Sequence, residues 1–577
     1  MLRSLVLVAV FAVAFAEDLQ LVLLHNNDMH SRFEETSRNS GTCPEDQKNI
    51  SCYGGFARTG HIIRQFREQA QKGNIPNVLY LNAGDIYTGT SWYSVHKWKI
   101  CADFMNILKP DAMSLGNHEF DSGPRGLLPF LQAVNFPVLA ANLELSNEPE
   151  LKIVKKSVVL DVNGVQVGVI GYLTPDTVQI SQTRGVIFQS EVSALTKESE
   201  RLDKEGVKII IALGHSGFLM DQEIARKVPL VDVVIGGHTN TFQWTGTPPD
   251  IEKPEDMYPK IIIQKSGKKV PVVQAYAYTK YMGVLNTTFN SNGDLVNFVG
   301  QPILLDHTIP QDQDILNNLD RYREEINQLS KMVIATTKVL LDGNANVCRQ
   351  MECNFGNLLA DALVQYVASL TSGKFWTKAP IGLVNGGGIR NSIEPGNITR
   401  AELIGVMPFD NRIVTLELTG ADLLKTLEIG ARSNGETSMG EFLQVSGLKY
   451  TVDRRQPPMS RIVHAEARCS DCLIPRYKTV DPKQNYTVVT FSFLSEGGDG
   501  HTILKEKGFN KRIEDLNDVD MVHWYLKKYS PVYPEVQGRI TIIEKDVPDS
   551  GCALIQVNFN VLFILIIMML TFVNFIS

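Results

Sequence analysis

The feature that most constrains this chain is a set of five short polar motifs, each placed directly after an apolar run. The preceding runs, such as Leu19–Leu24 and Val207–Leu213, are of strand length and rich in Leu, Ile and Val. In open α/β sheets, binding sites form where strands end at their carboxyl edge. The sequence therefore predicts an α/β fold in which five loops meet at one site. In chain order the motifs are Asp28-Met29-His30, Gly84-Asp85, Gly116-Asn117-His118-Glu119, Gly214-His215 and Gly236-Gly237-His238.

The residue types in these motifs are those that hold divalent cations. A pair of cations roughly 3.5–4 Å apart needs one bridging carboxylate, and imidazole, amide and carboxylate groups to complete each coordination shell. Asp85 is the predicted bridge. Asp28 and His30 can reach one metal, and the ligands that can reach the other are Asn117, His215 and His238. One Gly-His motif alone would more often be structural, but the five motifs together favour a binuclear metal site over a coincidence of loop residues.

The order of the motifs resembles that of the calcineurin-like metallophosphoesterases. Longer strings, from LGNHEFD at 115–121 to VNGGGIR at 384–390, resemble the ecto-5′-nucleotidase and apyrase family, and ALGHSGF, GGHTNTF and KVPVVQAYA lie between them. The resemblance runs from Leu21 to Ile543. It implies two divalent metal ions, zinc in this family, and it adds Asn240 to the metal ligands.

The resemblance also implies the architecture. It predicts an α/β protein with a layered α-β-β-α metallophosphoesterase domain at 17–310, joined by a helix at 311–332 to a second α/β (α+β) nucleotide-binding domain at 333–545. The length of 577 residues independently favours more than one domain. Apolar residues at helical spacing in the polar segment 315–332 predict that the connector is a solvated helix. Further helices are expected at 57–71, 192–204, 357–369 and 420–431, and strands at 381–384, 413–418 and 486–493.

Both ends of the chain carry processing signals. Residues 1–16 have a basic start, an apolar run and an A-x-A cleavage site, which is typical of a secretory signal peptide. Residues 551–577 end in an apolar run without a basic flank, and small residues precede that run. This pattern predicts a GPI-anchor signal that is removed on maturation, with Ser550 or one of the next two residues as the attachment site. A membrane-embedded C-terminus is the competing interpretation.

The eight cysteines and four N-glycosylation sequons fit an oxidising, secretory compartment. Six cysteines form close pairs that could each close a small loop, namely Cys43 with Cys52, Cys348 with Cys353, and Cys469 with Cys472. The last pair, spaced C-x-x-C, could instead serve metal or redox chemistry, but no second pair with zinc-finger spacing exists in the sequence. The sequons, which permit glycosylation, are at Asn49, Asn286, Asn397 and Asn485. The formal net charge of −7, without a basic block, argues against nucleic acid as a partner.

By resemblance to the family, His118 and Asp121 form the catalytic pair that stabilises the transition state. If Asn117 binds a metal, the neighbouring His118 points elsewhere, toward the phosphoryl group. An imidazolium there can stabilise charge on the phosphoryl oxygens or protonate the leaving alkoxide. Asp121 would then hold the tautomer of His118. The alternative is a purely structural His118.

Substrate recognition is assigned to the second domain, again by resemblance. The implied contacts are Arg349, Asn385 and Arg390, the purine-stacking rings Phe409 and Phe493, and the ribose acceptor Asp499. Guanidinium groups suit phosphate oxygens, whereas an isolated phenylalanine more often packs in a core. Two departures from the vertebrate pattern lie near the substrate, namely Thr88 where glutamine is expected and the charged Asp410-Asn411-Arg412. The supporting contact at position 88 and the nucleotide preference are therefore not carried over.

Together these features predict an extracellular 5′-nucleotidase that is GPI-anchored to the plasma membrane or shed from it. It would convert AMP to adenosine and phosphate by two-metal-assisted attack of water. An apyrase of the same fold, hydrolysing ATP and ADP, is one alternative, and an esterase of cyclic or 3′-nucleotides is another. A catalytically silent surface receptor or adhesion protein is an alternative of a different class, against which the intact ligand set argues. The family also implies a homodimer.

Overall fold

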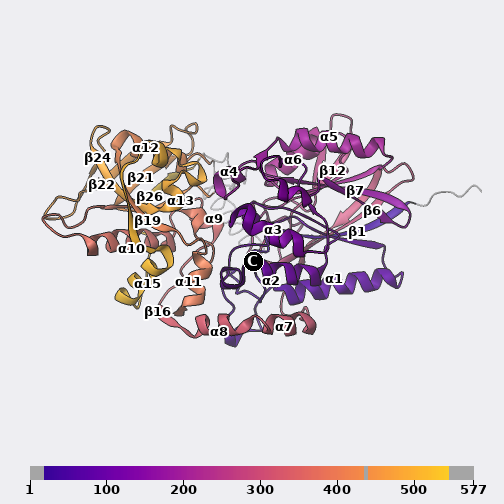
Figure 1. The fold of residues 1–577 in the computed structure, drawn as a ribbon, viewed down its shortest axis with the longest axis horizontal. Helices are drawn as coiled ribbons and strands as arrows, with labels where there is room; N and C mark the ends of the chain where they lie inside the picture. Colours follow the sequence, from indigo (N-terminus) through magenta and orange to yellow (C-terminus); the bar gives the residue numbers. More distant parts are fainter. Residues whose placement is uncertain (1–17, 434–439, 545–577) are drawn as a thin grey trace, which may run out of the picture.

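The computed structural model describes residues 18–433 and 440–544. These residues form two domains that lie side by side, with two connecting helices along one edge (Figure 1). The expected signal peptide at 1–16, the anchor residue Ser550 and the tail at 551–577 lie outside the described residues.

The first domain is built on two sheets. One sheet has the strand order β14-β13-β1-β2-β3-β4, with β15 paired to β13, and the other has the order β11-β12-β10-β9-β7-β6. The first consists of β1 (Leu19–Asn26), β2 (Asn77–Asn82), β3 (Ala112–Ser114), β4 (Val138–Leu139), β13 (Tyr281–Phe289), β14 (Leu295–Gly300) and β15 (Ile303–Leu304). The second consists of β6 (Ser157–Val162), β7 (Val165–Leu173), β9 (Ile209–His215), β10 (Val233–Ile235), β11 (Lys260–Ile263) and β12 (Lys269–Val273). A short pair, β5 (Leu143–Glu144) and β8 (Ile187–Phe188), lies apart.

Alternation along β1 shows how the layers form. Leu21 and Leu23 join the core between the two sheets, whereas Val22 and Leu24 join the core beneath the helices, because successive side chains of a strand point to opposite faces. The outer layers are helical, which confirms the expected α-β-β-α arrangement (Figure 1). Their helices are α1 (Phe56–Gln71), α2 (Ser91–Leu108) and α3 (Gly123–Ala133) on one side, and α5 (Glu191–Lys204) and α6 (Phe218–Lys227) on the other. The short α4 (Thr177–Ile180) lies toward the second domain.

The second domain holds a five-stranded sheet of order β20-β17-β24-β19-β25, a four-stranded sheet of order β23-β22-β21-β26, and the pair β16-β18. The predicted strand at 486–493 is shorter than expected, because helix α13 begins at Ser492. The strands are β16 (Val333–Thr337), β17 (Ile381–Asn385), β18 (Gly396–Thr399), β19 (Arg412–Thr419), β20 (Leu443–Ser446), β21 (Leu448–Asp453), β22 (Ile462–Arg468), β23 (Tyr477–Thr479), β24 (Asn485–Phe491), β25 (Phe509–Asn517) and β26 (Ile540–Ile543). The helices are α9 (Ala345–Cys348), α10 (Asn354–Leu370), α11 (Arg400–Val406), α12 (Gly420–Gly430), α13 (Ser492–Ser495), α14 (Thr502–Glu506) and α15 (Asp518–Tyr529).

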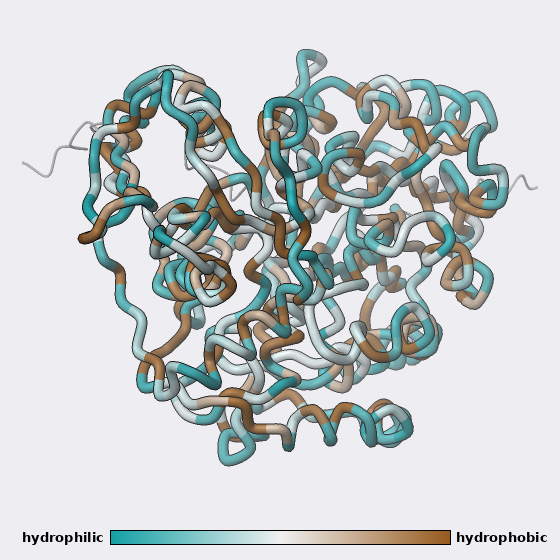
Figure 2. Tube along the Cα trace, turned by 60° about the vertical axis from the view of Figure 1, so that its left-hand side comes forward, coloured by the Kyte–Doolittle hydropathy of each residue, from teal (hydrophilic) through white to brown (hydrophobic). Residues whose placement is uncertain are grey.

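The connector differs from the single solvated helix that the sequence predicts. It forms two helices, α7 (Gln313–Asp320) and α8 (Arg323–Lys331), separated at Tyr322. The carbonyl of Tyr322 is 2.8 Å from Nε2 of His96 and the Tyr322 ring contacts the His96 ring, so this residue is held by α2. Brown and teal alternate along these helices at the bottom of Figure 2, and their apolar side chains join the first domain's core. The connector is therefore part of the first domain's packing; the buried residues are Ile315, Leu319 and Ile326.

The cysteines and sequons have clear positions in the structure. All four sequon asparagines are exposed, and Cys101 is free and buried. Within 18–433 and 440–544, no helix combines the length and apolar character needed to cross a membrane. The three predicted close pairs are confirmed as disulfides, which join Cys43 to Cys52, Cys348 to Cys353, and Cys469 to Cys472. Cys469 and Cys472 thus form a loop disulfide, which is the interpretation that the sequence analysis favoured over a metal site.

Candidate active site

The five predicted motifs lie at adjacent strand ends. β1, β2 and β3 are parallel neighbours in one sheet, and β9 and β10 are parallel neighbours in the other. Each strand therefore delivers the loop that follows it to the same edge of the sandwich. Asp28, His30, Asp85 and His215 are each at most 2% exposed there.

Asp85 lies at the centre of the cluster. Its Oδ2 atom is 2.9 Å from Nε2 of His215 and 3.8 Å from Nε2 of His30. Oδ1 of Asp28 is 3.6 Å from Nε2 of His30 and 3.7 Å from Nε2 of His215. Burial lowers the pKa of His215, but the charges of Asp85 and Asp28 outweigh burial and raise that pKa to about 10. Two carboxylates buried together therefore draw positive charge to this position.

The second part of the cluster faces the space between the domains. Nδ1 of His238 is 2.9 Å from Oδ1 of Asn117, and ligand atoms of Asp85, His215 and His238 lie within 4.8 Å of one another. Nε2 of His215 faces Oδ2 of Asp85, and Oδ1 of Asn240 is buried without a hydrogen bond to any residue in the described ranges. Buried polar atoms normally have a partner. The unpartnered Asn240 oxygen and the imidazole nitrogens gathered around Asp85 fit divalent cations, which would displace the proton from His215 and take up these lone pairs.

Backbone strain marks the loops that carry these ligands. φ is positive at Asp28 (48°), His30 (47°), Asp85 (58°), His238 (83°) and Asn240 (55°). Such conformations cost non-glycine residues roughly 1–3 kcal/mol each and cluster at functional sites. Here they turn the chain sharply enough for neighbouring loops to direct side chains at one point.

Glu119 is a support that the sequence motif contained but the sequence analysis did not assign. Its carboxylate accepts hydrogen bonds from the backbone N–H groups of Gly116 (2.6 Å), Asp85 (3.0 Å), Ile86 (2.9 Å) and Tyr87 (3.2 Å). Burial, followed by the charge of Asp85, raises the pKa of Glu119 to about 7. The side chain fixes the Asp85 loop against the loop after β3. Its place inside GNHE was the only signal available.

A second buried carboxyl supports the His238 loop. Asp221, on α6, accepts hydrogen bonds from the Tyr172 hydroxyl and from Nε2 of Gln274, each at 2.7 Å. Gln274 also donates to the carbonyl of Gly237 at 3.0 Å. Burial raises the pKa of Asp221 to about 7. No motif predicted this network, because its three side chains come from separate segments of the chain.

His118 and Asp121 lie together as predicted for the catalytic pair. Nδ1 of His118 is 2.7 Å from Oδ2 of Asp121, which also accepts a hydrogen bond from the Thr88 hydroxyl at 2.6 Å. Oδ1 of Asp121 accepts from Ser181 at 3.1 Å. Position 88 thus supplies a supporting contact, although threonine stands where the family resemblance leads one to expect glutamine. Because Nδ1 of His118 contacts Asp121, Nε2 is the ring nitrogen that faces the space between the domains.

A pocket of about 930 Å³ joins the two domains at this point. Nη2 of Arg390 reaches across it to within 3.3 Å of Nε2 of His30 and 3.2 Å of Nε2 of His118. Nδ2 of Asn385 donates to Oδ2 of Asp499 at 2.7 Å, and burial raises the pKa of Asp499. All six predicted substrate residues line the pocket, namely Arg349, Asn385, Arg390, Phe409, Phe493 and Asp499.

The two phenylalanines lie in different surroundings. The Phe409 ring stacks on the His118 ring with centroids 6.0 Å apart. Phe493 comes from α13 and packs on Gly498, where an added Cβ would lie 2.5 Å from the ring. Both rings line the pocket, and Phe493 also packs against the core of the second domain.

Polar contacts hold the domains together beside the pocket. The buried Arg32 donates to the carbonyls of His30 and Gly89 at 2.9 Å and to the carbonyl of Arg390 at 3.3 Å. Nδ2 of Asn391 donates to the carbonyl of Gly89 at 2.7 Å. Side-chain hydrogen bonds to backbone carbonyls therefore join the loops that carry His30 and Gly89 to the loop that carries Arg390 and Asn391.

Comparison with protein families divides the chain in the same way. The calcineurin-like phosphoesterase family matches residues 21–242, and the 5′-nucleotidase C-terminal domain family matches residues 333–506.

Individual relatives match across most of the chain. Protein 5NUC of Lutzomyia longipalpis is 45% identical over 554 residues, covering 94% of this chain and 96% of that protein. The 5′-nucleotidase of Homo sapiens is 40% identical over 529 residues, covering 90% of each chain. Among solved structures, the 5′-nucleotidase precursor from Thermus thermophilus matches with a TM-score of 0.84 at 34% identity, covering 91% of this chain and 100% of that chain.

Proposed function

This chain belongs to the 5′-nucleotidase family of metal-dependent phosphoric monoester hydrolases, and we propose that its principal substrate is AMP. The observation that carries the proposal is the shared pocket. It places Asn117, His118 and His238, at the edge of the Asp85-centred cluster, on one wall, and two arginines with two phenylalanine rings on the other. A phosphate can lie between the ligand set and the guanidinium groups while the base lies between the rings.

The ligand set divides between two cations that share Asp85. One cation would be held by Asp28, His30, Asp85 and Asn240, and the other by Asp85, Asn117, His215 and His238. Mixed imidazole, amide and carboxylate ligands suit zinc, which we propose as the metal. When bound, such a pair neutralises phosphate charge and makes water a nucleophile at neutral pH.

The chain's own residues orient the phosphoryl group and handle its charge. Arg390 lies close enough to Nε2 of His118 for both groups to contact one phosphate. Asp121 holds the opposite nitrogen of His118. His118 can then stabilise charge on the phosphoryl oxygens or give a proton to the departing nucleoside oxygen as water attacks phosphorus in line. We propose that the remaining contacts are Arg349 and Asn385 to the substrate and Asp499 to the ribose.

Phosphate release from a panel of nucleotides by the purified ectodomain tests the proposal. We expect AMP to be hydrolysed fastest, with adenosine and phosphate as products. Faster release from ATP and ADP would replace the proposal with an apyrase, and faster release from 3′- or cyclic nucleotides would replace it with another esterase. No release from any nucleotide with both metals bound would favour a silent surface protein.

We propose further that the mature protein is extracellular, dimeric and held on the cell surface by a GPI anchor. Three disulfides and four exposed sequon asparagines support passage through an oxidising secretory compartment. A phosphatidylinositol-specific phospholipase should release the protein from membranes. Protein that stays bound after complete digestion, with peptides from 561–573 present, would mean a true C-terminal membrane segment.

Light scattering of the released protein tests the proposed dimer and should give twice the protomer mass.

A further inference from the structure

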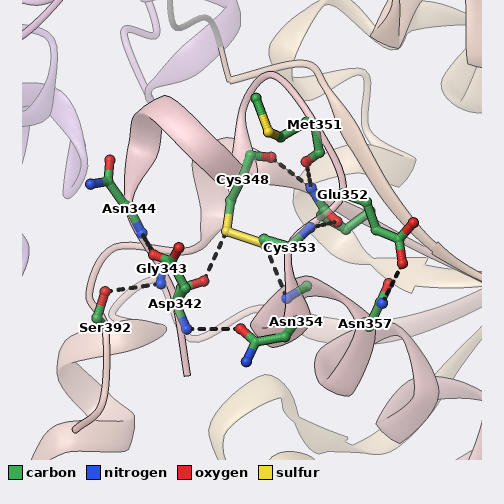
Figure 3. Close-up of a disulfide and its surroundings, with 12 residues drawn as sticks. Asp342, Gly343, Asn344, Cys348, Met351, Glu352, Cys353, Asn354, Asn357 and Ser392 are labelled. Carbon is green, nitrogen blue, oxygen red and sulfur yellow. Dashed lines mark hydrogen bonds between the residues drawn. A yellow bond between two sulfur atoms is a disulfide. The ribbon is translucent and has the colours of Figure 1, made fainter. Parts of the chain in front are cut away.

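The loop that carries Arg349 is unusually well anchored for a surface connection. A disulfide joins Cys348 and Cys353 and closes the loop at its base. Figure 3 shows how the loop and the start of α10 are held by hydrogen bonds on several sides. Oε1 of Glu352 accepts from Nδ2 of Asn357 at 2.7 Å and from the backbone N–H of Gln537 at 2.6 Å.

Gln444 makes the inner set of contacts to this loop. The side chain, on β20, is fully buried at 0% exposure. Its Nε2 donates to the carbonyls of Cys348 at 2.8 Å and Met351 at 2.7 Å. Its Oε1 accepts from the backbone N–H of Cys353 at 3.0 Å. One amide therefore satisfies three backbone groups of the loop, on both sides of Arg349.

The same strand pair brings a second segment against the loop. β20 pairs with β17, so that Gln444 lies opposite Val384 and Leu443 opposite Asn385. The glycine that follows, Gly386, touches the loop backbone closely. A Cβ added there would lie 2.3 Å from the carbonyl oxygen of Cys348 and 3.0 Å from Cα of Arg349. The loop is thus hydrogen-bonded by the Gln444 amide and packed against the backbone that leads out of Asn385.

We propose that Gln444 is a positioning residue for the nucleotide, acting through the Arg349 loop and touching no substrate itself. The inference rests on the proposed function, because it needs Arg349 to contact the substrate. Removing the amide leaves two carbonyls and one N–H without their buried partner, and such groups move to find another one. A shift of about 1 Å in a substrate-positioning group can cost roughly 10²-fold in rate.

The principal test is Gln444→Met, which keeps the length of the side chain and removes all three hydrogen bonds. We expect KM for AMP to rise about tenfold to 10²-fold, with kcat changed less than about threefold, because Arg349 would bind substrate and transition state alike. Metal content should not change. The matched control is Gln264→Met, which also removes two buried hydrogen bonds, those to the carbonyls of Ala225 and Val228, in the first domain outside the pocket.

A double-mutant cycle with Arg349→Ala separates positioning from general destabilisation. In the Arg349→Ala background, Gln444→Met should lower kcat/KM by less than about twofold. If Gln444→Met does not fold, Gly386→Ala replaces it, because the added methyl group displaces the same loop. Its effect on kcat/KM should likewise nearly disappear in the Arg349→Ala background. An equal effect of either variant with and without Arg349, or unchanged KM in a folded Gln444→Met protein, would overturn the inference. Failure of the wild type to hydrolyse AMP would instead overturn the proposed function.

Discussion

The two walls of the pocket are built on different principles. On the first-domain wall, five of the seven proposed metal ligands sit at positive φ, namely Asp28, His30, Asp85, His238 and Asn240, and buried carboxyl groups such as Glu119 fix their loops. On the second-domain wall, Arg349 and Asn385 have ordinary φ values of −95° and −75°. Their positions depend on a disulfide and on hydrogen bonds from distant strands. The wall that would perform chemistry thus combines strained backbone turns with buried carboxyl supports, whereas the part of the other wall that carries Arg349 and Asn385 depends on a disulfide and on packing between distant strands. Asp499, at φ 52°, shares the strained backbone of the first wall.

The largest loss of activity should come from a substitution at the centre of the first-domain wall. Asp85→Ala removes the carboxylate shared by both proposed metal positions, so both cations should be lost with it. AMP hydrolysis should fall by more than the roughly 10²–10³-fold cost of losing one transition-state donor. Elemental analysis of the purified variant measures the metals. Near-normal metal content would contradict the bridging role.

Removing the second-domain wall altogether should cause the next largest loss of AMP hydrolysis. A fragment of residues 18–331 keeps α7 and α8, whose apolar residues Ile315, Leu319 and Ile326 belong to the first domain's core. We expect this fragment to bind metal but to hydrolyse AMP very poorly, because the second wall is missing. Metal analysis and phosphate release on the same sample provide the measurement. Full AMP hydrolysis by the fragment would remove the second domain from substrate recognition.

His118→Ala should leave both the fold and the metals in place. The side chain faces the pocket and is held by Asp121 rather than by a strand end. Loss of a positioned acid or charge stabiliser should lower kcat by roughly 10²–10⁴-fold. Steady-state kinetics with AMP and metal analysis test this together. If the variant loses metal, His118 is a ligand, as its closeness to Asp85 and His30 also allows.

On the second wall, Phe409→Ala and Phe493→Ala should mainly raise KM for AMP. Base–aromatic stacking contributes roughly 1–3 kcal/mol per base, which corresponds to about fivefold to 150-fold. The two variants should differ, because Phe409 also stacks on His118 and its loss should lower kcat as well. Adenosine inhibition constants give an independent measure of base binding. Unchanged inhibition by adenosine in both variants would show that neither ring holds the base.

The difference between the walls also explains what the sequence could predict. Proposed metal ligands such as Asp28 and Asp85 follow strands at short offsets, so their meeting point could be derived from local pattern and sheet topology. The layered α-β-β-α fold was assigned through the family resemblance. The substrate residues were assigned through family resemblance, because an isolated Arg349 or Phe493 carries no local signal of its role.

Other features of the structure could not be predicted from local sequence pattern. The Asp221 network joins side chains from three distant segments, and the Gln444 amide reaches a loop 91 to 96 residues away in sequence. The break in the connector at Tyr322 depends on contacts with α2. Such contacts form only when remote segments pack together, so composition and periodicity within one segment do not contain them.

The smallest effect should come from Thr88, at the edge of the first wall. Its hydroxyl donates to Oδ2 of Asp121, the same oxygen that contacts Nδ1 of His118. Thr88→Ala should leave metals and KM unchanged and lower kcat by roughly twofold to tenfold, since a hydrogen bond contributes about 0.5–1.5 kcal/mol net. Thr88→Ser, which keeps the hydroxyl, should retain most activity. In an Asp121→Ala background the loss caused by Thr88→Ala should disappear, because the hydroxyl then has no carboxylate to orient. A loss that persists there would mean that Thr88 acts on the substrate directly, and that the first wall also takes part in recognition.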